Sequence, residues 1–81
     1  MNDPLQVSFV GPVRRPSPER QMTVDAETLG LETVADLMRH LGYKDRELKS
    51  LHVLADGARR ELDQPLQGVE SVEILIAIGG G

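Results

Sequence analysis

Residues 72–81 read VEILIAIGGG, and this stretch decides how the rest of the chain is interpreted. Its β-branched residues occupy every second position: Val72, Ile74, Ile76 and Ile78. A period of two, with such side chains on one side, predicts a strand that buries one face in a core. The glycines Gly79, Gly80 and Gly81 follow directly. We therefore expect a buried strand that leads into a flexible tail and ends in a free carboxylate.

Composition restricts the class of protein. The chain has 81 residues, 40% of them hydrophobic, which suffices for one small domain. It contains no cysteine, so disulfides and thiolate zinc sites are excluded, and a reducing, cytoplasmic location is expected. No stretch approaches the roughly 20 apolar residues of a membrane span, and the N-terminus lacks a signal-peptide pattern. The net charge of -4 argues against binding to nucleic acid.

The first third of the chain predicts a hairpin. Leu5, Val7 and Phe9 alternate with polar residues and indicate a strand, and residues 19–25 indicate a second strand antiparallel to it. Three prolines lie in residues 12–18, which we interpret as the loop between the strands. The arginines at positions 14 and 15 of this loop are either solvated or in contact with an acidic partner or nucleotide.

One main helix is expected after the hairpin. A possible start is a capping box formed by Thr33 and Asp36, and an N-cap at Thr28 or Gly30 is the alternative. The apolar stripe has helical spacing and consists of Val34, Leu37, Met38 and Leu41. Gly42 is well placed to end the helix in the left-handed conformation. His40 lies in its last turn, without partners at metal-site spacing.

The second half predicts further strands. Residues 43–50 are polar, with room for a short helical turn, and residues 51–56 indicate a third strand. A turn at residues 56–57 leads to a brief edge strand at 59–62, and the final strand begins at about residue 70. The predicted fold class is therefore α+β. It is a four- to five-stranded mixed sheet packed on one main helix, with the first and last strands as parallel neighbours, which is the β-grasp, or ubiquitin-like, arrangement. We expect one domain over residues 1–78 and a glycine tail over 79–81.

Residues 56–75, together with the terminal glycines and the helix segment ETVADLM at 32–38, resemble the MoaD/ThiS family of sulfur carriers. This family comprises the small subunit of molybdopterin synthase and the sulfur carrier of the thiamine pathway. The resemblance implies that a MoeB/ThiF-like, ubiquitin-activating-type enzyme adenylates the Gly81 carboxylate. A persulfide sulfur then displaces AMP, and the resulting thiocarboxylate donates sulfur to a biosynthetic enzyme. The receiving pathway (molybdopterin, thiamine or a related one) is left open by the residues.

The chemistry fits this kind of tail. A free α-carboxylate is an anion at neutral pH and can attack the α-phosphorus of ATP, after which the mixed anhydride is an electrophile. Gly79 and Gly80 lack a Cβ, so they suit threading through a narrow channel. On the strand face away from the helix, Leu75 and Ala77 are expected to group with Leu54 as a partner-docking patch. The alternative is a satellite cluster covered by residues 56–68.

Two other functions remain open. The same tail would serve a ubiquitin-like modifier that forms isopeptide bonds through Gly81, and a passive interaction domain could carry an incidental glycine-rich end. The sequence contains no glycine-rich phosphate loop before a helix, no nucleophilic cysteine and no metal-site spacing. We therefore expect a co-substrate protein with no enzymatic activity, no cofactor and no metal of its own.

Overall fold

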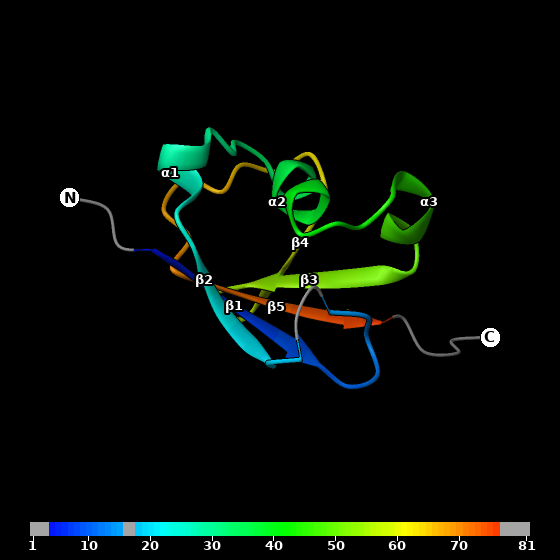
Figure 1. Ribbon diagram of the computed structural model, residues 1–81. Helices are drawn as coiled ribbons and strands as arrows, with labels where there is room; N and C mark the ends of the chain where they lie inside the picture. The colour runs from blue at the N-terminus through cyan, green and yellow to red at the C-terminus, as the bar shows by residue number, and fades with distance from the viewer. Residues whose placement is uncertain (1–3, 16–17, 77–81) are drawn as a thin grey trace.

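The computed structural model describes residues 4–15 and 18–76, which form a five-stranded mixed sheet with helices on one of its faces (Figure 1). The strands are β1 (Leu5–Val10), β2 (Gln21–Val24), β3 (Leu51–Ala55), β4 (Ala58–Arg60) and β5 (Ser71–Ile76). Their order across the sheet is β2-β1-β5-β3-β4. The β1–β5 pair is parallel, and the other neighbours are antiparallel. The α+β class and the mixed sheet predicted from the sequence are confirmed.

The core follows from the period-two pattern of the central strands. Val72 and Ile74 of β5 are 0% exposed, and so is Val7 of the neighbouring β1. The intervening Glu73 and Leu75 are only partly buried, because alternate side chains point to opposite faces of a sheet. The strand that precedes the glycines is therefore fixed at the centre of the sheet by neighbours on both sides.

The main helix, α2 (Val34–His40), forms where its capping signal predicted. The Thr33 side chain accepts a hydrogen bond from the Asp36 amide (3.2 Å), and the Asp36 carboxylate accepts one from the Thr33 amide (3.1 Å). These bonds satisfy amides that a helix start leaves without partners. All four residues of the predicted apolar stripe are buried. Gly42 follows the helix with φ +96°, so the predicted left-handed stop is also confirmed.

Two short helices flank α2. The first, α1 (Ala26–Leu29), was not predicted: its N-cap is Asp25, whose carboxylate accepts from the Thr28 amide at 3.1 Å, and Gly30 ends it with φ +70°. The alternative helix start at Thr28 or Gly30 is therefore wrong, because the chain completes one turn and stops there. The second, α3 (Asp45–Leu48), occupies the segment where a short helical turn was predicted.

The segment after β4 packs against the start of α2. The edge strand ends at Arg60, so the predicted strand over 59–62 is shifted: Leu62 instead supplies its carbonyl to the Ala35 amide (2.8 Å). Gln64 likewise accepts from the Val34 amide at 3.0 Å. These two bonds again engage amides of the first helical turn, so residues 61–66 seal the N-terminal end of α2.

Candidate functional site

The predicted reactive tail, residues 79–81, follows β5 in the chain, and the last described residue before it is Ile76. Ile76, the last residue of β5, lies opposite Leu51 of β3, and Leu75 lies between Val10 of β1 and His52 of β3. Because neighbouring strands on both sides pair with β5 near this point, the end of β5 has a fixed position at one end of the sheet. The tail residues Gly79, Gly80 and Gly81 lie outside the described residues, and so does Ala77. Their roles stay predictions.

The sheet face opposite the helices carries an apolar patch, which we call the open-face patch and define as Val10, Leu54 and Leu75. Val10 is directly paired with Leu75 across the parallel ladder, and Leu54 is the diagonal neighbour of Leu75 on β3, since its direct partner is Glu73. Val10 is 38% exposed, and the two leucines are partly buried. The structure thus places both described residues of the predicted docking patch on one face, next to the end of β5.

Val10 was missed by the sequence reasoning, although a signal for it exists. It directly follows the inward-facing Phe9, which is 2% exposed, so the period of two assigns Val10 to the outer face. A parallel pairing of β1 with β5 then brings it to the end of β5. The alternative interpretation, in which residues 56–68 cover this patch, gains no support from residues 61–66. Leu62 and Gln64 bond to the first turn of α2, and residues 33 and 65 form a β-bridge on that side.

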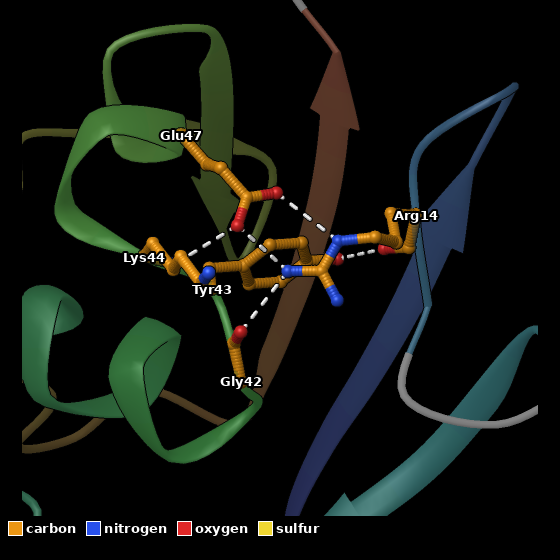
Figure 2. Close-up of polar contacts among 5 residues, drawn as sticks. All are labelled: Arg14, Gly42, Tyr43, Lys44 and Glu47. Carbon is orange, nitrogen blue, oxygen red and sulfur yellow. Dashed lines mark hydrogen bonds and ion pairs between the residues drawn. The ribbon is translucent and has the colours of Figure 1, made fainter.

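The loop after β1 is fastened to the helical side at the same end of the sheet (Figure 2). The Arg14 guanidinium donates to both carboxylate oxygens of Glu47 in α3, at 2.8 and 3.1 Å, and to the Gly42 carbonyl at 3.0 Å. It also lies over the Tyr43 ring, 5.1 Å from the centroid, while the Tyr43 hydroxyl donates to the Arg14 carbonyl. Because Glu47 also accepts from the Lys44 amide (3.0 Å), one carboxylate holds both the loop and the start of α3.

The electrostatics of this cluster follow from its contacts. The hydrogen bonds from Arg14 hold the pKa of Glu47 below its usual value, and the same bonds raise the pKa of Arg14. Burial raises the pKa of Tyr43, so its hydroxyl keeps its proton and remains a donor at neutral pH. From the sequence, Arg14 was expected either to be solvated or to contact an external acidic partner or nucleotide. Neither interpretation included this internal ion pair with Glu47. Its partners are 33 residues apart, and no local spacing reveals such a contact.

Residues 4–15 and 18–76 contain no group of three or more histidine, cysteine or carboxylate side chains arranged to hold a metal ion. No helix of these residues is long and apolar enough to cross a bilayer. Comparison with protein-family models, curated proteins and solved structures found no significant match.

Proposed function

We propose that this protein is a sulfur carrier with a β-grasp, ubiquitin-like fold, which presents the Gly81 carboxylate for adenylation and thiolation. The observation that carries the proposal is the position of β5. The strand that leads into the glycine run is the central strand of the sheet, and it ends beside an apolar patch on the open face. A rigid central strand is a suitable base for a reactive end that must be delivered into another protein's active site.

The strand order supports the β-grasp assignment. A hairpin (β1–β2), a covering helix (α2) and a final strand parallel to β1 together give the order β2-β1-β5-β3-β4. Parallel first and last strands in a mixed sheet are what the hydrophobic pattern of the sequence predicted. The parallel pair needs a crossover connection, and α2 supplies it.

The proposed chemistry takes place on the main chain. The Gly81 carboxylate attacks the α-phosphorus of ATP, pyrophosphate leaves, and an acyl adenylate remains. A sulfur nucleophile then displaces AMP. With sulfide the product is the thiocarboxylate itself, whereas a persulfide gives an acyl disulfide that a second thiol must reduce. Five residues follow β5, and they span at most about 17 Å when extended, so the body of the protein stays close to the enzyme surface.

Because the body of the protein stays close to the enzyme, its open-face patch can contact the enzyme surface. We assign to Leu54 and Leu75, with Ala77, the contact to the ubiquitin-activating-type enzyme. Apolar side chains grouped on an exposed sheet face commonly mark an interface. Burial of this surface would offset the entropy lost when the glycine tail becomes ordered in a channel. The sulfur-accepting biosynthetic enzyme would receive the same tail.

Intact-mass measurement tests the proposal. The protein is incubated with ATP, a sulfide source and a ubiquitin-activating-type enzyme from its own cells. The expected result is a mass gain for one oxygen replaced by sulfur. This gain should disappear when the thiocarboxylate is hydrolysed, and it should be absent when Gly80 and Gly81 are deleted. The mass of the protein isolated from those cells establishes whether Gly81 is its final residue. Conjugates on other proteins would instead identify a modifier, and a cellular function that survives deletion of the two glycines would identify a passive domain.

A further inference from the structure

The charges of this protein are strongly segregated along the sequence. Residues 11–20 and 39–52 contain seven of the nine lysines and arginines of the chain: Arg14, Arg15, Arg20, Arg39, Lys44, Arg46 and Lys49. They contain three of the thirteen acidic residues: Glu19, Asp45 and Glu47. The two segments therefore carry a net charge of +4 (seven minus three), although the whole chain carries -4. The remainder carries -8 (-4 minus +4).

The fold brings residues 11–15 and 18–20 of the first basic segment, and the second segment, to the end of the sheet where β5 stops (Figure 1). The first segment follows β1, whose last residue pairs with Leu75, and the second leads into β3, whose first residue pairs with Ile76. The contact of Arg14 with Glu47 joins the two segments directly. We call this end of the molecule the basic end.

The opposite end of the sheet is acidic. Asp25 follows the last residue of β2 and begins α1, which also carries Glu27. Asp56 follows β3, and its carboxylate accepts from the amides of Ser71 (2.9 Å) and Glu70 (3.1 Å) where β5 begins. Opposite charges therefore lie at the two ends of β5, and the molecule has a large electrostatic dipole along that strand.

Part of the positive charge at the basic end is not neutralised internally. Arg14 is paired with Glu47, and Arg39 is paired with Asp45 at 2.9 Å. Four further cations are exposed and form no ion pair with any residue in 4–15 or 18–76: Arg20, Lys44, Arg46 and Lys49. These four cations can bind an acidic partner without first losing an internal ion pair.

We propose that the basic end docks against an acidic protein surface around the site that receives the tail. This inference rests on the proposed function, because that function supplies the reason for a partner at the end of β5. An acidic receiving surface attracts the basic end and repels the acidic one. The dipole therefore turns the molecule so that β5 points at the partner before contact, which raises the association rate.

Nucleic acid is the other polyanion to consider, and the structure disfavours it. Recognition of single strands relies on aromatic side chains that stack on bases. The chain has only two aromatic residues, Phe9 and Tyr43, and they are 2% and 5% exposed. A long phosphate backbone would also extend from the basic end along a body that carries -8. A compact acidic protein surface needs no stacking aromatic side chains, and it does not have to extend along the acidic part of the body.

The main test is a charge-neutralised variant, R20Q/K44Q/R46Q/K49Q, in tail activation by the enzyme described above. We expect its KM to rise about tenfold at an ionic strength of about 0.01 M with kcat unchanged, and the difference to vanish near 1 M, where charges are screened within about 3 Å. E27Q, which removes an exposed charge at the acidic end of the sheet, should not raise KM. A quadruple variant that folds normally and keeps the parental KM at low salt would overturn the proposal.

A second measurement separates failure of this inference from failure of the proposed function. The full chain, isotopically labelled, is titrated at low salt with deca-glutamate and, separately, with decathymidylate, and amide NMR shifts are followed. Salt-sensitive shifts at residues 11–15, 18–20 and 44–52 with deca-glutamate, lost in the quadruple variant, are expected even if no tail activation exists. Tighter binding of decathymidylate, or shifts spread equally over both ends of β5, would contradict the inference.

Discussion

The most informative perturbation is Leu75→Glu, because Leu75 and its neighbour Ile74 point to opposite faces of β5. Leu75 lies on the open face between Val10 and His52, and it is only partly buried. A partner can bury only the part still exposed, so the lost apolar contact is below about 1 kcal/mol of the ~2 kcal/mol of full leucine burial. A carboxylate left without a partner in a dry interface adds roughly 2 kcal/mol.

Together these costs predict that Leu75→Glu lowers kcat/KM for tail activation at least about tenfold, since each 1.4 kcal/mol is a factor of ten. The free energy of unfolding should change by less than about 1 kcal/mol, because the side chain stays on a solvated face. Pyrophosphate exchange measures the first quantity and denaturant titration the second. Thr23→Glu is the matched control: it adds the same charge to an exposed position of edge strand β2, two strands away from β5. If Leu75→Glu is activated as well as Thr23→Glu, the docking role of the patch is wrong.

Four further outcomes are expected. Ile74→Ala, at a 0% exposed position, should lower the free energy of unfolding by about 2–5 kcal/mol in a urea titration. Thr33→Ala removes the N-cap of α2 and should cost about 1 kcal/mol by the same measurement, whereas Thr33→Ser should cost much less. The Ser71 and Glu70 amides lower the pKa of Asp56, so its stabilising contribution is present above the unfolded-state pKa and is lost as pH falls through the folded-state pKa. Asp56→Asn should therefore reduce the loss of unfolding free energy at acidic pH, and an unchanged loss would contradict this. Glu47→Ala should speed hydrogen exchange of the Lys44 amide, because it removes the carboxylate that accepts from this amide, while exchange of the Ile74 amide stays slow.

Elements with a local repeating signal were predictable from the sequence. The alternation of β1 and β5, the stripe and capping box of α2, and the left-handed Gly42 each arise from residues close together in the chain, and each was confirmed. The parallel neighbours at the centre were also predicted, because one helix between them supplies the required crossover. Leu54 and Leu75 could be assigned to the open face because side chains alternate between the two faces of a strand.

What was missed depends on distant contacts or on segments shorter than one period. The four residues of α1 are too few to show an apolar stripe, and its start depends on a single Asp25 carboxylate. β4 ends early because Leu62 bonds to α2, a partner far away in the chain. The pairing of Arg14 with Glu47 is invisible to any sequence pattern. The basic end could not be predicted from the sequence either, because its cations come from two separate segments, residues 11–20 and 39–52, which only the fold brings together.

The central pairing of β1 with β5 has a consequence for biosynthesis. The ribosome makes β1 first and β5 last of the described strands, so the hairpin and the β3–β4 unit must both wait for the segment that joins them. A nascent chain cut short before Ser71 would leave the Val7 and Phe9 side chains without their sheet neighbours and vulnerable to proteases. A cell would thus discard copies that lack β5, and every copy that folds carries the strand on which the proposed reactive end depends.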